Sequence, residues 1–155
     1  MHARITTAAL LDRLERIIDL RVGELEIAEF GNLDFRQRDS EQQLIVHRGP
    51  RAWFEDELDF CQRSLTNYYD ANGDHRLAFR EEIVAFTRCL RPAPCTVEAF
   101  CRWFQERAAG LAEPIDAAPR GRGREACVLL DAWNEQLRVC VTEQEYLAVY
   151  WSTSA

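Results

Sequence analysis

Lysine is absent from this chain of 155 residues, and all 19 basic residues are arginines. A Schiff base needs a lysine amine, and a nucleotide P-loop needs its lysine at the phosphates, so both kinds of site are excluded. The sequence also has no G-x-S-x-G motif, no glycine-rich nucleotide loop and no cysteine–histidine dyad spacing. We therefore expect that the chain is not an enzyme.

Paired cysteine motifs and long apolar runs are missing as well. None of the six cysteines forms a C-x-x-C pair, and no histidine stands at zinc-finger spacing from them. We interpret the cysteines as small buried side chains of a protein in a reducing compartment. Because no long apolar run precedes Asp12, neither a signal peptide nor a membrane span is predicted, and a cytoplasmic location is the default expectation.

The chain also lacks an excess of positive charge, since its formal net charge is -7 and its pI is near 5.0. An acidic chain repels phosphate backbones, so we expect no nucleic-acid partner. A hydrophobic fraction of 47% is enough to fill an ordinary core, which argues against disorder. The length predicts a single domain over residues 1–155, with lobes 1–91 and 95–155 as an alternative.

Over most of the sequence, apolar residues recur at helical spacing. This spacing predicts helices near residues 8–20, 52–69, 79–90, 96–104, 125–133 and 142–151, the first of them capped by Thr6 or Thr7. A capping box of Thr142 and Glu145 begins the last of these helices. Only 25–27 and 44–46 are predicted to be extended, and 110–124, with two prolines and three glycines, is predicted to be a loop. The sequence therefore predicts an all-α fold of about seven helices.

One segment, Asp70–Glu81, carries oxygen-bearing side chains at regular spacing. Asp70, Asn72 and Asp74 stand at its first, third and fifth positions, and Glu81 stands at the twelfth. Calcium takes about six to eight oxygen ligands, and short side chains on alternate residues of a tight turn can converge on one ion. Arg76, at the seventh position, would add its backbone carbonyl, and Glu81 would add both carboxylate oxygens. These five residues are the predicted calcium ligands, and we expect Ca²⁺ as the cofactor.

The pattern D-x-N-G-D-x-x-L-x-x-x-E in this segment resembles the EF-hand family, including calmodulin-like proteins and bacterial calcium buffers. The resemblance implies EF-hand-like helix–loop–helix pairs with very short strands between the loops. It also implies a role as a calcium buffer, a structural calcium protein or a calcium-dependent regulator. The sequence departs from the family at the sixth position, where His75 replaces the usual glycine. Histidine is enriched among the non-glycine residues that adopt positive φ, so His75 is expected to weaken binding rather than forbid it.

Two further segments, Ile18–Glu29 and Asn134–Glu145, fit the same frame without its ligands. They suggest a fold of several hands with one live site, and ordinary helix–turn–helix pairs are the alternative. A solvated turn is the alternative for Asp70–Glu81 itself. A metal-free helical module that binds a protein partner is therefore the second functional hypothesis, and a small enzyme with an unrecognised site is the third.

Other chemistry-bearing residues receive structural interpretations. We predict surface or core positions for His2 and His47, and core or groove positions for the four tryptophans. The acidic residues Glu55 to Asp59 are interpreted as the wet face of a helix rather than a di-carboxylate site. Arg120–Arg124, which could also contact an acidic partner or phosphates, is interpreted as a solvated loop.

Overall fold

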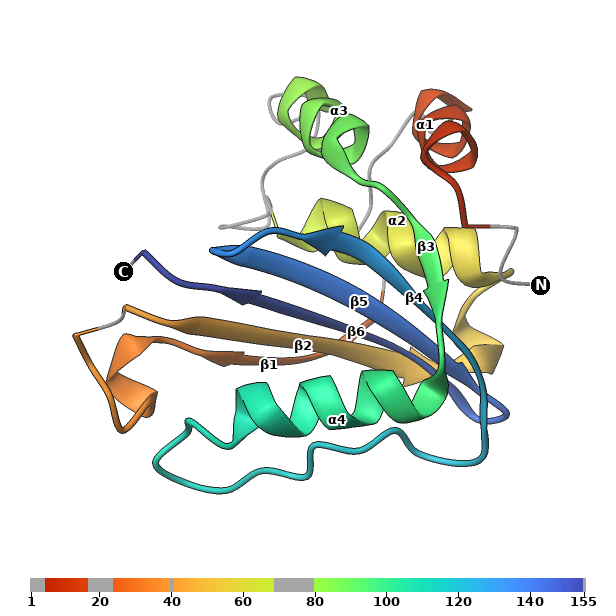
Figure 1. Ribbon diagram of the computed structural model, residues 1–155. Helices are drawn as coiled ribbons and strands as arrows, with labels where there is room; N and C mark the ends of the chain where they lie inside the picture. The colour runs from red at the N-terminus through yellow and green to blue at the C-terminus, as the bar shows by residue number, and fades with distance from the viewer. Residues whose placement is uncertain (1–4, 17–23, 40, 69–79, 155) are drawn as a thin grey trace.

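The computed structural model describes residues 5–16, 24–39, 41–68 and 80–154 (Figure 1). Within these ranges, four α-helices accompany a six-stranded antiparallel sheet. The strands are β1 (Glu26–Phe30), β2 (Gln43–Pro50), β3 (Ala93–Cys95), β4 (Gly123–Asp131), β5 (Glu135–Thr142) and β6 (Glu145–Ser152). The predicted all-α fold is therefore wrong, and so is its arrangement as EF-hand-like helix pairs.

The strand order in the sheet is β1-β2-β6-β5-β4-β3, so the last strand of the chain lies at the centre beside β2. Val46 of β2 pairs with Val149 of β6, and Val139 of β5 pairs with Ala148 of β6. Nearly every residue of β2 and β6 is buried, because helices or loops cover both faces of the sheet. A strand buried on both faces has a continuous apolar sequence instead of an alternating one.

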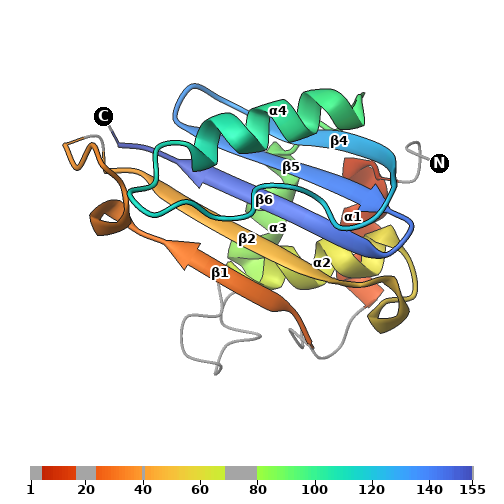
Figure 2. The same cartoon turned by 90° about the horizontal axis from the view of Figure 1, so that it is seen from below.

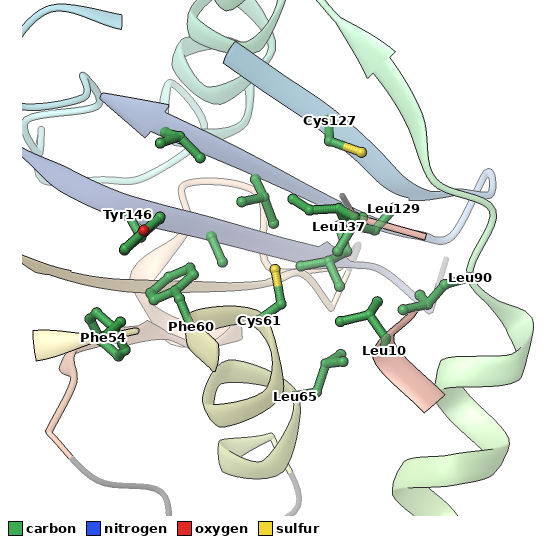
Figure 3. Close-up of a cluster of buried hydrophobic side chains, with 14 of the residues drawn as sticks. Leu10, Phe54, Phe60, Cys61, Leu65, Leu90, Cys127, Leu129, Leu137 and Tyr146 are labelled. Carbon is green, nitrogen blue, oxygen red and sulfur yellow. The ribbon is translucent and has the colours of Figure 1, made fainter. Parts of the chain in front are cut away.

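The sheet lies between two layers. Helices α1 (Thr7–Arg16), α2 (Glu57–Asn67) and α3 (Arg80–Cys89) cover one face, and α4 (Val97–Ala108) with the segment 109–122 covers the other (Figures 1 and 2). Under the three helices, Phe60, Cys61 and Leu65 of α2 pack with strand residues such as Leu137 (Figure 3). A second core, built around Phe100 and Phe104, lies under α4. The chain thus forms a mixed α/β fold, and not the expected helix–loop–helix pairs.

The predicted helices near 8–20, 52–69, 79–90 and 96–104 are confirmed as α1 to α4. Helix α2 is shorter than predicted, α4 continues to Ala108, and residues 17–20 lie outside the described part of the chain. Asp56 caps α2 by accepting a 2.9 Å hydrogen bond from the Asp59 amide, and Thr96 caps α4 by accepting one of 3.0 Å from the Ala99 amide. The predicted extended pieces lie in or beside β1 and within β2. None of the described helices has both the length and the apolar composition needed to cross a bilayer.

The predicted helices at 125–133 and 142–151 are wrong, because these residues form β4 and β6. The supposed degenerate hand Asn134–Glu145 is also wrong, since it is strand β5 and the turn after it. The other one, Ile18–Glu29, lies partly outside the described residues, and its end belongs to β1. Thr142 Oγ1 does accept a hydrogen bond of 3.0 Å from the Glu145 amide, as in a capping box, but here it closes the β5–β6 turn.

Candidate metal-binding segment and its surroundings

The predicted calcium segment connects the C-terminal end of α2 to the N-terminal end of α3. Asp70, Asn72, Asp74 and Arg76 lie outside the described residues. Glu81, the predicted twelfth-position ligand, is the second residue of α3 and is exposed. The expectation that a helix begins at this position is therefore confirmed, while the ligand set stays a prediction.

The C-terminal end of α2 is anchored to the sheet by His47 of β2. The Nδ1 atom of His47 lies 2.7 Å from Ser64 Oγ, and the imidazole stacks on the Tyr68 ring with centroids 4.7 Å apart. Tyr68 is the C-cap residue of α2 and the last described residue before the segment. The chain is thus held at Tyr68, two residues before the predicted segment, by an aromatic stack on His47, which itself contacts Ser64.

The other end of the segment is anchored through α1 and the core. Arg80, the first residue of α3, donates a hydrogen bond of 2.9 Å to the carbonyl of Leu14 in α1. Ile83, one turn later, is 1% exposed and belongs to the core under the three helices. The two chain ends that enter and leave the segment are therefore both fixed by the folded domain.

His47 itself is buried and uncharged at neutral pH. Burial lowers the pKa of its imidazole to about 4, against a smaller opposing effect of the Asn67 side chain. Ser64 is 3% exposed, so a substrate has no access to its hydroxyl. The Ser64–His47 pair therefore resembles a nucleophile and base in composition only. Of the surface or core positions predicted for His47, the structure shows the core position.

Metal ligation elsewhere is not supported within the ranges that the structure describes. No group of three or more His, Cys, Asp or Glu side chains there is arranged to hold a metal ion. The described residues therefore add no ligand cluster that would support metal binding. The prediction of further EF-hand-like segments depended on the all-α fold, which is wrong. All six cysteines are free thiols. Their interpretation as small buried side chains is right for Cys61, Cys127 and Cys140 and wrong for the others, since Cys95 and Cys101 are half-buried and Cys89 is exposed.

The acidic residues around the start of α2 stabilise that helix. Asp59 accepts a 2.9 Å hydrogen bond from the Glu55 amide and pairs with Arg63 at 3.1 Å, and Asp56 pairs with Arg13 of α1 at 3.1 Å. Asp59 is only 9% exposed, and Glu57 is buried as well. The interpretation as a wet helix face is therefore wrong for Glu57 and Asp59, whereas Glu55 is exposed. Asp56 and Asp59 serve capping and ion pairing.

A buried ion pair on the other face of the sheet fixes the segment 109–122. Arg48 Nη1 lies 3.2 Å from Glu145 Oε2, which also accepts a 2.7 Å hydrogen bond from the Arg120 amide. The Arg120 guanidinium pairs with Glu26 at 2.8 Å. Burial raises the pKa of Glu145, while the Arg120 amide and the Arg48 charge act in the opposite direction. Residues 120–124 are all exposed, as predicted for a solvated loop, although Gly123 and Arg124 already belong to β4 and Arg120 is tied to Glu145 and Glu26.

Two of the cavities in the structure, which the sequence did not predict, have linings of distinct chemistry. One, of about 540 Å³, has a lining of mixed charge that consists of Arg51, Arg122, Arg124, Glu57, Glu125, Glu143, Gly123 and Val141. The other, of about 200 Å³, lies on the three-helix face and is lined by Gln43, Ile45, Tyr68, Phe86, Glu135 and Tyr150. The alternation of residues 146, 148 and 150 toward one face of β6 was the available signal for the second cavity.

Searches with protein-family models, among curated proteins and among solved structures find no match to this chain. The resemblance of Asp70–Glu81 to the EF-hand family therefore rests on the residues of that segment alone.

Proposed function

We propose that the protein binds one calcium ion through Asp70–Glu81. The donors are the side chains of Asp70, Asn72, Asp74 and Glu81 and the backbone carbonyl of Arg76. Three of these side chains are carboxylates, which suit a hard dication and partly neutralise it. The fold differs from an EF-hand pair, so the proposal concerns a single EF-hand-like loop inserted between two helices of a mixed α/β domain.

The observation that carries the proposal is the position of Glu81 relative to its helix. The exiting helix of such a loop places the twelfth residue on its first turn, and α3 begins at Arg80. Glu81 is exposed, so the core does not occupy its carboxylate. The entering helix α2 ends at Asn67, three residues before Asp70. The positions of the two flanking helices therefore support the proposal.

A structural or buffering role suits this setting better than that of a promiscuous sensor. Sensors open a methionine-rich groove when they bind calcium, and this chain has one methionine, at position 1. The described residues on either side of residues 69–79 are anchored, Tyr68 by its stack on His47 and Arg80 by its hydrogen bond to Leu14. A calcium ion bound between these two fixed points would link α2 to α3, so calcium is expected to stabilise the domain with little rearrangement.

The deciding experiment is calcium titration by calorimetry on protein that has been treated with a chelator. It is paired with thermal melts in the presence of calcium and in the presence of chelator. A ligand at about 100 times its dissociation constant adds about 2.7 kcal/mol to the stability of the state that binds it. A variant with both Asp70→Asn and Glu81→Gln is the matched control, and its melts should coincide. If the wild-type melts coincide as well and no heat is released, the segment is a solvated turn, and a metal-free interaction module becomes the better hypothesis.

A further inference from the structure

The 200 Å³ cavity on the three-helix face is built by rings from three different elements. Tyr150 comes from β6, Tyr68 from the end of α2, and Phe86 from α3. The Tyr68 and Tyr150 rings are 5.2 Å apart and inclined at 41°, so they form adjoining walls instead of one flat surface. Ile45 of β2, which pairs with Tyr150 across the sheet, supplies the apolar floor.

One carboxylate stands among these rings. Glu135, at the start of β5, accepts a hydrogen bond of 2.6 Å from the Tyr150 hydroxyl. Of the six described residues that line the cavity, none is basic, and Glu135 is the only one with a formal charge. His47, behind Tyr68, is neutral at pH 7. The cavity therefore combines aromatic faces with one uncompensated negative charge in its lining.

The walls are fixed before any ligand arrives. The Tyr68 ring is held from behind by the His47 stack at 4.7 Å, and Tyr150 is held by its short, charge-assisted bond to Glu135. Walls that are already in place reduce the ordering cost of binding. The volume is below the roughly 300–1,000 Å³ of cavities that enclose a drug-sized ligand, so it suits a head group and not a large molecule.

We propose that this cavity binds an alkylated ammonium group, such as a quaternary ammonium head group. Aromatic faces attract cations through the ring quadrupole, and cages of rings with a carboxylate recognise quaternary ammonium ligands. A primary ammonium is a poorer fit because it carries three N–H donors. The acceptors in the lining are few, namely the Glu135 carboxylate, the Gln43 amide oxygen and the tyrosine hydroxyls. Alkyl groups on nitrogen need no acceptors and contact Phe86 and Ile45 favourably.

The test uses choline and its neutral isostere 3,3-dimethylbutan-1-ol, which has the same shape without the charge. Each is titrated into the full chain by calorimetry, with chelator present so that the calcium segment takes no part. Choline should bind at least about fivefold more tightly than the alcohol, because only the cation gains from the rings and from Glu135. Equal affinities, or no binding of choline at tens of millimolar, would overturn the proposal.

Variants locate the binding in this cavity. Glu135→Gln keeps an acceptor for the Tyr150 hydroxyl but removes the charge, so choline should bind about fivefold more weakly and the alcohol unchanged. Glu143→Gln removes the same charge from an exposed residue of the β5–β6 turn and should leave both affinities unchanged. Phe86→Leu keeps apolar volume without the ring, and choline binding should again weaken selectively. Equal effects of Glu135→Gln and Glu143→Gln would mean that overall charge, and not this cavity, attracts choline.

Discussion

His47 of β2 and Ser64 of α2 are joined by a hydrogen bond of 2.7 Å between Nδ1 and Oγ, in a part of the core where the histidine has no exposed surface. The same imidazole stacks on Tyr68 at the end of α2. The neutral imidazole thus links the sheet to the helix that enters the predicted calcium segment. Its protonation would place an unpaired charge in the core, so the link depends on pH.

The stability of the protein should fall between neutral pH and pH 5 because of His47. Its folded-state pKa of about 4 lies below the ordinary 6.5, so the unfolded chain takes up the proton first as the pH falls. The contribution of neutral His47 is complete above about pH 6.5 and is lost progressively down to about pH 4. At pH 5 the loss is on the order of 2 kcal/mol, from about 1.4 kcal/mol per pH unit.

The measurement is urea unfolding at pH 7.5 and pH 5 of the wild type and of His47→Gln. Glutamine keeps a polar contact for Ser64 but does not titrate, so the variant should lose about 2 kcal/mol less than the wild type over this range. The other ionisable groups are common to both proteins and cancel in the difference. The same loss in both proteins would show that His47 is not the group that titrates.

The ion pair of Arg48 and Glu145 should show strong coupling in a double-mutant cycle. The side chains are 9% and 3% exposed, so Glu145→Leu would leave the arginine charge buried without its partner. That single change should cost about 3–5 kcal/mol in the free energy of unfolding. Combining it with Arg48→Met removes both charges and should restore part of that loss. Additive losses in urea unfolding would show that the two residues act independently.

The sequence predicted the helices well and most of the sheet poorly, for a physical reason. Helices α1 to α4 each bury one face, so their apolar residues recur at helical spacing. Strands β4 to β6 are covered on both faces, so apolar and polar residues do not alternate regularly along them. Thr142 added to the error, because its hydrogen bond with the Glu145 amide is common to a helix cap and to this turn.

Of the two proposed sites, the sequence suggested the calcium segment but not the aromatic cavity. The calcium pattern is local, so twelve consecutive residues were enough to suggest it, and the start of α3 at Arg80 agrees with it. The aromatic cavity joins Tyr68, Phe86, Glu135 and Tyr150, which come together only when α2, α3, β5 and β6 are packed. The alternation along β6 indicates only the face on which Tyr150 lies, and the other lining residues are known only once the strand order and the helix packing are known.

Gly121→Ala should destabilise the protein by about 1–2 kcal/mol. Gly121 has φ +85°, in the left-handed region, where a Cβ atom is strained. An added Cβ would also lie 2.8 Å from Cγ of Gln144, which must move aside. Gly31→Ala is the matched control, because φ there is −96° and no atom lies within 4 Å of the new Cβ. Urea unfolding should show a loss for the first variant only, and equal effects would refute the backbone explanation.

Glu81→Gln should weaken calcium binding more than Asn72→Ala. Glu81 would supply two oxygens and a full negative charge, whereas Asn72 would supply one neutral oxygen. We expect Glu81→Gln to reduce the affinity by at least about tenfold, equivalent to about 1.4 kcal/mol, in calorimetric titrations. Glu82→Gln is the control, since Glu82 is the exposed neighbour in the same first turn of α3. Both carboxylates lie near the N-terminus of α3, where they interact favourably with the helix dipole, so both variants lose a similar amount of helix stability. Any additional loss at Glu81 therefore reports ligation. If Glu81→Gln and Glu82→Gln bind calcium equally well, Glu81 is not the twelfth-position ligand and the EF-hand-like geometry is wrong.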